Sequence, residues 1–153
     1  MITLYIDDDI EDTEIFQEAI TSIDPEVVFY SAADGHEGFR ILEQITVVPD
    51  FIFLDVNMPR MNGKEFLNQI KKKVTFRSIP VIMYSTTSHA EEIRNYKKMG
   101  AFAFVKKPDS FKTLQEVLQK IIRGKAIGDW EPTDTRFPMP SEFEWKAEVR
   151  RRR

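Results

Sequence analysis

Residues 51–63 read FIFLDVNMPRMNG, and this stretch indicates the fold class. Its first four residues are all apolar, without the alternation of a strand that has one face in water, which is typical of a strand buried on both faces of a parallel sheet. Asp55 ends the apolar run, and the proline, asparagines and glycine that follow predict a loop. Parallel sheets carry helices on both faces, so the stretch favours an α/β protein.

The same succession of short apolar runs and helix-period segments continues along the chain. Further strands are predicted at 3–6, 27–32, 80–84 and 101–105. Apolar residues spaced by three and four predict helices, which we place on Ile15, Phe16, Ala19, Ile20 and Ile23, at 35–45, on Phe66, Leu67 and Ile70, and at 88–99 and 110–122. Pro25 and Gly100 are expected to end the first and fourth of them. Five strand–helix units predict an open, doubly wound parallel sheet with its site at the carboxyl ends of the strands.

The length of 153 residues suggests one domain, which we assign to residues 1–123, followed by a tail at 124–153. Prolines predict an extended segment in the first half of the tail, and a capping box that starts at Ser141 predicts a short helix after it. Both tryptophans, Trp130 and Trp145, belong to the tail. We therefore expect the tail to pack, either on its own domain or on a second copy of the chain in a homodimer.

Composition and charge exclude several classes of protein. The chain has no cysteine, so disulfides and thiolate chemistry are excluded. The start MITLYIDDD is neither a signal peptide nor a membrane span, and we expect a cytoplasmic protein without a membrane partner. The net charge is −3, and the four arginines at 150–153 are the only candidate basic patch, so we expect no nucleic-acid partner.

Polar side chains follow four of the five predicted strands, at the point where each strand ends. Listed by strand, they are Asp7 and Asp8 after the first, Asp55 after the third, Ser85 and Thr86 after the fourth, and Lys106 and Lys107 after the fifth. The carboxyl ends of parallel strands meet at one edge of a sheet, which is where sites lie in doubly wound folds. We expect these carboxylates, hydroxyls and lysines to converge on that edge.

Such a set of side chains suits phosphoryl transfer. Carboxylates of Asp7, Asp8 and Asp55 held close together repel one another, and Mg²⁺, which prefers oxygen ligands and retains several waters, would relieve this. Asp55 would then be a carboxylate nucleophile that forms an aspartyl phosphate. A lysine and Mg²⁺ neutralise the charge of the transferred group, and Ser85 can donate to its oxygens.

Each of these residues also has a purely structural interpretation. Asp9, and less readily Asp7 or Asp8, could cap the first helix, which is a common position for aspartate. Ser85 could simply end its strand, and one of Lys106 and Lys107 is expected to lie in solvent. The convergence of all of them on one edge favours a functional site.

Four motifs carry a resemblance to a known family: IDDD at 6–9, LDVNMPRMNG at 54–63, YST at 84–86 and VKKP at 105–108. Together they make the chain similar to the receiver domain of two-component response regulators, from residue 1 to about residue 123. The LDVNMPRMNG motif is the specific one. The resemblance implies a flavodoxin-like fold with strand order 2-1-3-4-5, and a stand-alone phosphorylation switch that controls protein–protein interactions.

The resemblance implies that Asp55 accepts a phosphoryl group from a histidine kinase or a histidine phosphotransfer protein. It implies that Mg²⁺ is ligated by Asp8, Asp55 and the backbone carbonyl of Asn57, with Asp7 acting mostly through water. Lys107 would contact the phosphoryl group. No enzymatic activity is implied beyond the gain and loss of this group.

Further roles are implied for residues around the acceptor. Ser85 would be the switch hydroxyl and Phe104 the switch aromatic, which lacks the hydroxyl of the tyrosine that many receivers have there. Asn57 and Thr87 would tune the dephosphorylation rate. The Lys107–Pro108 bond resembles one that is cis in the family. A downstream protein target is implied, but no DNA-binding output domain is expected.

The alternative function is a phosphatase of the haloacid-dehalogenase type. The DxD pattern at Asp7 and Asp9 fits such an enzyme, with Asp7 as the nucleophile and Asp9 as the general acid, but it leaves the LDVNMPRMNG motif without a purpose. A receiver-like binding module that never takes phosphate is a third class. The intact set of acceptor, acid pair, hydroxyl and lysine argues against it.

Overall fold

The computed structural model describes residues 1–86 and 89–123. One parallel sheet of five strands runs through these residues in the order β2-β1-β3-β4-β5. The strands are β1 (Ile2–Ile6), β2 (Val28–Ala32), β3 (Phe51–Leu54), β4 (Val81–Ser85) and β5 (Ala103–Lys106). The flavodoxin-like strand order expected from the sequence is confirmed.

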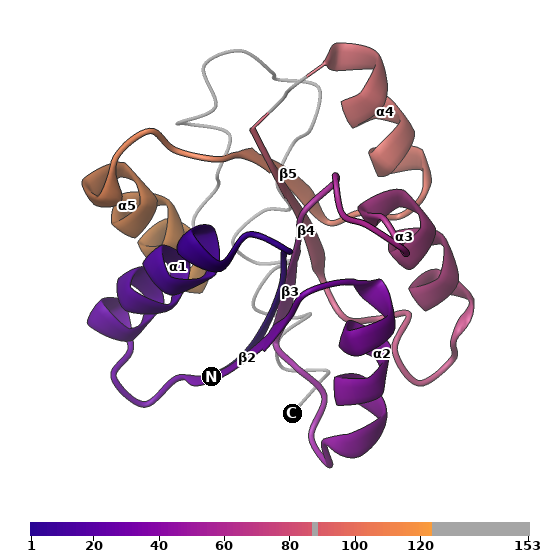
Figure 1. Ribbon diagram of the computed structural model, residues 1–153, viewed down its shortest axis with the longest axis horizontal. Coiled ribbons are helices and arrows are strands. Elements are labelled where there is room, and N and C mark those ends of the chain that lie inside the picture. Colours follow the sequence, from indigo (N-terminus) through magenta and orange to yellow (C-terminus); the bar gives the residue numbers. More distant parts are fainter. Residues whose placement is uncertain (87–88, 124–153) are drawn as a thin grey trace.

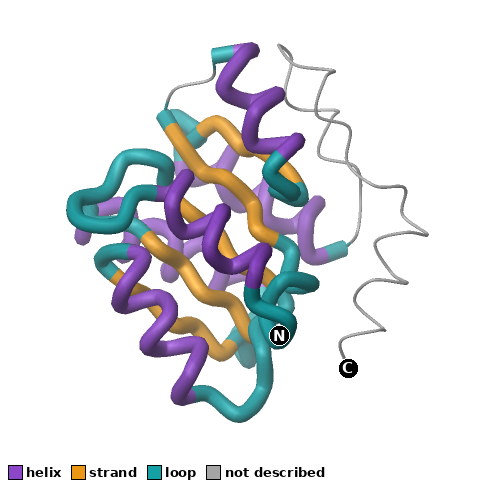
Figure 2. The backbone as a smooth tube through the Cα atoms, turned by 90° about the vertical axis from the view of Figure 1, so that its right-hand side faces the viewer, coloured by secondary structure: helices purple, strands orange, loops and turns teal. Residues whose placement is uncertain are grey.

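Helices cover both faces of this sheet, as the continuous apolar strands predict. They are α1 (Ile10–Ile23), α2 (Gly35–Gln44), α3 (Gly63–Lys72), α4 (Ala90–Lys98) and α5 (Phe111–Ile122). Helices α1 and α5 lie side by side on one face, whereas α2, α3 and α4 cover the other (Figure 1). In Figure 2 the layer of α2, α3 and α4 faces the viewer, with the strands behind it and the other helices farther back. None of the helices within the described residues is long and apolar enough to cross a lipid bilayer.

The core is apolar through the centre of the sheet and aromatic on the side of α1 and α5. All residues of β3 and β4 are buried. Tyr5 stacks on Phe16 with ring centroids 4.3 Å apart, and Phe53 and Tyr84 pack around the same phenylalanine. Buried aromatic pairs of this kind contribute about 0.5–1.5 kcal/mol beyond the burial of their area. The packing therefore holds α1 firmly against the strands that carry the site.

Capping residues set where the helices begin and end. Asp9 is the N-cap of α1, and its carboxylate accepts a hydrogen bond of 3.0 Å from the backbone N–H of Asp12, so the capping role considered for Asp9 is confirmed. Gly100 has φ +95°, and the backbone N–H groups of Gly100 and Ala101 donate to Lys97 and Tyr96. This is a Schellman motif, which requires a residue in the left-handed conformation that glycine adopts without strain.

Two details differ from the sequence predictions. Ile15 is exposed, because Phe16, Ala19 and Ile20 form the stripe that faces the sheet and Ile15 lies one residue outside it. The Lys107–Pro108 bond is trans rather than cis, as are all peptide bonds of the described residues. Trans is the isomer that an X–Pro bond favours, by about 0.5–1 kcal/mol, when no contact stabilises cis. Thr87, and the extended segment and short helix predicted within 124–153, lie outside the described residues.

Candidate functional site

The strand register brings the predicted site residues to one edge of the sheet. Ile6 of β1 pairs with Leu54 of β3, so the next residues along the two strands, Asp7 and Asp55, lie next to each other. The backbone N–H of Asp55 donates to the carbonyl of Ile6 at 2.9 Å. On the other side of β3, the backbone N–H of Lys107 donates to the carbonyl of Ser85 at 2.7 Å. Parallel pairing thus assembles residues that lie up to 100 positions apart in the chain.

Three carboxylates form a cluster at this edge. One oxygen from each of Asp7, Asp8 and Asp55 lies within 4.8 Å of the other two, and Asp7 and Asp55 are buried whereas Asp8 is exposed. Mg²⁺ is typically held by one or two carboxylates and retains several waters, which an exposed ligand such as Asp8 permits. The cluster therefore fits a hard divalent cation.

The charge state of Asp55 depends on its surroundings. Burial and the nearby carboxylate of Asp7 raise the pKa of Asp55 to about 6, although Lys107 opposes the shift. Without a cation, ionisation of Asp55 therefore lowers the stability of the folded protein. A divalent cation in the cluster would offset the repulsion and keep Asp55 anionic at neutral pH.

Asp7 is fixed through both of its oxygens. Its Oδ1 accepts from the backbone N–H of Asp9 at 3.0 Å, while its Oδ2 accepts from the hydroxyl of Tyr5 at 2.8 Å and from Lys107 at 2.7 Å. Burial and the neighbouring Asp7 raise the pKa of Tyr5 far above its usual range, so the phenol keeps its proton and remains a donor. Asp7 is thus bonded through both oxygens and unable to rotate freely.

Lys107 lies at the centre of the charges. Its Nζ is 2.7 Å from Asp7, 2.8 Å from Asp12 and 3.6 Å from Oδ1 of Asp55, and it lies 5.5 Å from the centroid of the Tyr84 ring. Burial disfavours the ammonium, but its hydrogen bonds to Asp12 and Asp7 outweigh burial and raise the pKa of Lys107 well above its usual range. Lys107 is therefore a permanent cation beside Asp55.

Contacts at its two ends and in its middle hold the loop that follows Asp55, residues 56–63. At its far end Gly63 donates to the carbonyl of Val56 at 3.1 Å, and a side chain at Gly63 would meet the backbone carbonyl of Asp55. In its middle Arg60 has φ +63°, and its guanidinium pairs with buried Asp34 at 2.9 Å. These contacts fix the backbone that presents Asn57 beside the carboxylates.

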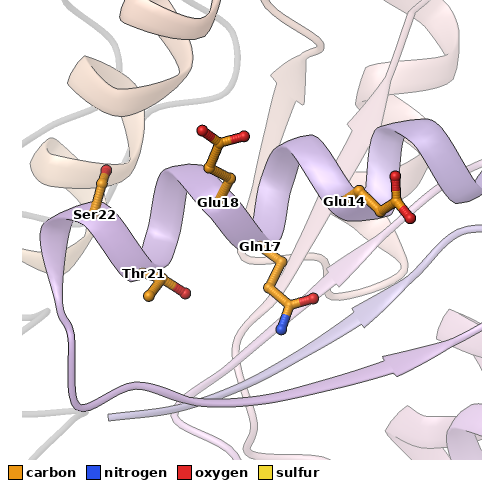
Figure 3. A pocket seen from close by; sticks show the side chains of 5 residues that line it. All are labelled: Glu14, Gln17, Glu18, Thr21 and Ser22. Carbon is orange, nitrogen blue, oxygen red and sulfur yellow. The ribbon is translucent and has the colours of Figure 1, made fainter.

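A surface cavity of about 530 Å³ opens beside the cluster, between this loop and α4. Its lining residues are Asp8, Val56, Asn57, Met58, Pro59, Asn62, Lys64, Glu92 and Tyr96. A second hollow, of about 430 Å³, lies along α1 and is lined by Glu14, Gln17, Glu18, Thr21 and Ser22 (Figure 3). The second hollow includes none of the strand-end residues, whereas the first is lined by Asp8 and by residues that directly follow Asp55.

The remaining predicted residues lie around this centre. Ser85 is fully buried at the end of β4. Phe104 is buried in β5 and stacks on Tyr96 of α4 with ring centroids 6.1 Å apart. Lys106 and Thr86 are exposed. The structure therefore brings Asp7, Asp8, Asp55 and Lys107 together, and it keeps Phe104 packed inside rather than in solvent.

Three residues of the site were missed by the sequence analysis: Tyr5, Asp12 and Tyr84. Tyr5 and Tyr84 appeared as ordinary members of apolar strands. Asp12 follows the N-cap Asp9 by three positions, where an acidic residue is usual in a first helical turn. The alternation of strand side chains could have placed Tyr5 on the same face as Asp7. Nothing in the sequence directs Asp12 toward Lys107.

Comparisons with known proteins agree with this geometry. Residues 3–119 match the family model described as response regulator receiver domain. The protein-glutamate methylesterase/protein-glutamine glutaminase of Rhizobium etli is 42% identical over 93 residues, which are 59% of this chain and 25% of that protein. An enzyme of the same description from Koribacter versatilis is 36% identical over 74% of this chain and 32% of its own length. The chain thus spans between a quarter and a third of these curated relatives.

Two solved structures are similar over almost the full length of their chains. The phosphorylated cyanobacterial phytochrome response regulator RcpA superposes with a TM-score of 0.72 at 25% identity, over 88% of this chain and 96% of that one. The chemotaxis response regulator CheY4 of Vibrio cholerae superposes with a TM-score of 0.67 at 28% identity, over 78% and 96% of the two chains.

Proposed function

This chain belongs to the response regulator receiver family of two-component signalling, and on that premise we propose that it is a phosphorylation switch whose acceptor is Asp55. One observation carries the proposal. Asp55 is a buried carboxylate with oxygens of Asp7 and Asp8 within 4.8 Å and the Lys107 ammonium at 3.6 Å. The proposed nucleophile, the proposed cation ligands and the positive charge of Lys107 therefore lie close together, as phosphoryl transfer requires.

The proposed reaction is transfer from a phosphohistidine of a histidine kinase or phosphotransfer protein. A carboxylate oxygen of Asp55 attacks phosphorus, so the new O–P bond forms as the P–N bond breaks. The imidazole nitrogen leaves with the electron pair and takes up a proton. Mg²⁺, when bound, would neutralise the negative charge of the phosphoryl oxygens. Lys107 supplies a second, fixed positive charge on the side of α1.

The proposed ligands of Mg²⁺ are the carboxylates of Asp8 and Asp55 and the backbone carbonyl of Asn57. The exposure of Asp8 and the position of Asn57 in the wall of the adjacent cavity support this choice. Asp7 already accepts hydrogen bonds at both oxygens, which supports a role for it through water.

We assign the switch to Ser85 and Phe104. Ser85 ends β4 at the same edge as Asp55, and its hydroxyl would bond a phosphoryl oxygen. Phe104 packs on Tyr96 of α4, so a shift of β4 and its loop would change the surface of α4 and β5 that a downstream protein target contacts. Asn57 and Thr87 are proposed to tune how long the phosphoryl group persists. Residues 1–123 are the proposed switch domain.

A phosphatase in which Asp7 is the nucleophile has weaker support. Each oxygen of Asp7 already accepts a hydrogen bond, and one lies 2.7 Å from the Lys107 ammonium. The proposed general acid, Asp9, caps α1 through its own carboxylate. Both groups are thus engaged in holding the structure, whereas the Lys107 ammonium lies beyond hydrogen-bond distance of the Asp55 carboxylate, at 3.6 Å.

Incubation with Mg²⁺ and a small phosphodonor such as acetyl phosphate tests the proposal by intact mass. Wild-type protein should gain one phosphoryl group and Asp55→Asn none, because an amide does not attack phosphorus. Asp109→Asn, which changes an exposed aspartate near the same edge, should gain it as the wild type does. Labelling of Asp55→Asn at the wild-type rate would refute the assignment.

A further inference from the structure

The Lys107 ammonium is shared unequally among three carboxylates. Asp7 and Asp12 lie at hydrogen-bond distance, 2.7 Å and 2.8 Å, whereas Asp55 lies at 3.6 Å. The face of the Tyr84 ring, 5.5 Å away, closes another side. In this resting arrangement the lysine is drawn toward α1 and away from the acceptor.

A phosphoryl group on Asp55 can gain this lysine only if one of the two close carboxylates gives it up. The two are not equivalent, because the side chain of Asp7 is 1% exposed and that of Asp12 is 39% exposed. A buried carboxylate that loses its cation keeps an uncompensated charge, which is strongly unfavourable. An exposed carboxylate is hydrated by water instead, so its ion pair breaks at little cost. Asp12 is therefore the partner that can release Lys107.

We propose that Asp12 is a positioning residue that competes with the phosphoryl group on Asp55 for the Lys107 ammonium. The inference rests on the proposed function and deepens it, since Asp12 lies on α1 rather than at a strand end. In the resting protein Asp12 holds the lysine, and after phosphorylation the lysine leaves Asp12 for the phosphoryl oxygens. Asp12 thereby weakens the phosphorylated state relative to the resting one.

The competition predicts that the affinity of the site for a phosphoryl analogue rises when Asp12 loses its charge. Asp12→Asn keeps the size of the side chain and leaves untouched the backbone N–H that donates to Asp9. Lys107 then has one competitor fewer, so a phosphoryl analogue at Asp55 should bind more tightly. The expected gain is about threefold to fivefold, which corresponds to the upper part of the free-energy range measured for exposed ion pairs.

Calorimetric titration of the full chain with beryllofluoride in saturating Mg²⁺ measures this directly. Asp12→Asn should bind about threefold to fivefold more tightly than wild type. The matched control is Glu11→Gln, which removes the same charge from an exposed neighbour in the same helical turn and should stay within about twofold of wild type. Lys107→Gln removes the shared group, and in that background Asp12→Asn should change nothing.

The double-variant comparison separates positioning from simple repulsion between Asp12 and an anion. A gain that persists without Lys107, or a gain of equal size in Glu11→Gln, would overturn the inference and leave the proposed function standing. An Asp12→Asn protein that binds no better than wild type would do the same. Wild-type protein that binds no beryllofluoride would instead overturn the proposed function, and this inference with it.

A second measurement needs no variant of the buried lysine. In NMR spectra of ¹⁵N-labelled protein, the chemical shift of each lysine ammonium depends on the groups that bond to its Nζ. The Lys107 signal should shift on Asp12→Asn substitution, and in wild type it should move away from its resting position when Mg²⁺ and beryllofluoride are added. A Lys107 signal that is the same in Asp12→Asn and wild type would contradict the proposal.

Discussion

The hydroxyl of Tyr5 donates a 2.8 Å hydrogen bond to Oδ2 of Asp7, and both side chains are buried. Tyr5 lies in β1 and Asp7 directly follows this strand, two positions after Tyr5, so their side chains point to the same face of the sheet. The same oxygen of Asp7 accepts from Lys107 at 2.7 Å. A tyrosine of the core thus supports the position of a carboxylate in the site.

Tyr5→Phe should test that support. The substitution keeps the ring that stacks on Phe16 and removes only the donor. A hydrogen bond to a charged group contributes about 1.5–3 kcal/mol, so the free energy of unfolding should fall by that order. Urea unfolding measures the loss. Unchanged stability would mean that Lys107 and Asp9 suffice to hold Asp7.

Asp55→Asn should stabilise the metal-free protein at neutral pH. The pKa of Asp55 is about 6 in the folded protein, above its value of 3.8 when unfolded, so folding with an ionised Asp55 is penalised by about 3 kcal/mol above pH 7. As pH falls through 6 toward 4, wild type takes up the proton and the penalty disappears. The advantage of Asp55→Asn should therefore be about 2–3 kcal/mol at pH 7.5 and close to zero at pH 4.

Chemical denaturation in EDTA at several pH values measures this difference, with Asp109→Asn as the exposed control. Mg²⁺ should raise the stability of wild type alone, because a cation that binds only the folded state adds stability by mass action. Parallel pH profiles for wild type and Asp55→Asn would show that Asp55 is not ionised at a cost in the folded protein.

Asp8→Ala should weaken Mg²⁺ binding at least about tenfold without loss of fold. Its side chain is exposed, so stability should change by less than about 0.5 kcal/mol. Asp9→Asn is the matched control, since it removes a neighbouring charge while asparagine still caps α1. Calorimetry should show Mg²⁺ affinity near the wild-type value for Asp9→Asn. Equal losses in both variants would indicate a diffuse electrostatic effect instead of a ligand.

Gly63→Ala should disturb both the fold and the metal site. An added methyl group would meet the backbone carbonyl of Asp55, so the acceptor loop or the start of α3 has to move. We expect a loss of about 1–3 kcal/mol in stability and weaker Mg²⁺ binding. Gly100→Ala, at φ +95° and far from the cluster, should lower stability by about 1 kcal/mol and leave Mg²⁺ affinity unchanged.

Much of the architecture was predictable because its signals are local. The continuous apolar residues of β3 and β4 identified a parallel sheet, and the aspartates at strand ends followed from the rule that such ends meet at one edge. Capping by Asp9 and Gly100 was likewise visible in the sequence. Fold and approximate site therefore followed from short-range patterns and topology.

The contacts within the site were not predictable, because they depend on rotation of elements against one another. Whether Lys107 turns toward Asp55 or toward α1 depends on the position of α1, which the packing of Phe16 on Tyr5 determines. Asp12 enters the site for that reason. The exposure of Ile15 has the same origin, since a small rotation of α1 decides which of two adjacent apolar residues faces the sheet.

Locating the phosphorylated residue tests the central claim most directly. Wild-type protein is incubated with Mg²⁺ and acetyl phosphate and then reduced with borohydride, which converts a phosphorylated aspartate to homoserine. Peptide mass spectrometry then identifies the position. The account predicts homoserine at residue 55 and none at residues 7, 8 or 9. Homoserine at residue 7 would contradict it and support the phosphatase alternative, and a protein with no homoserine at any position would contradict both.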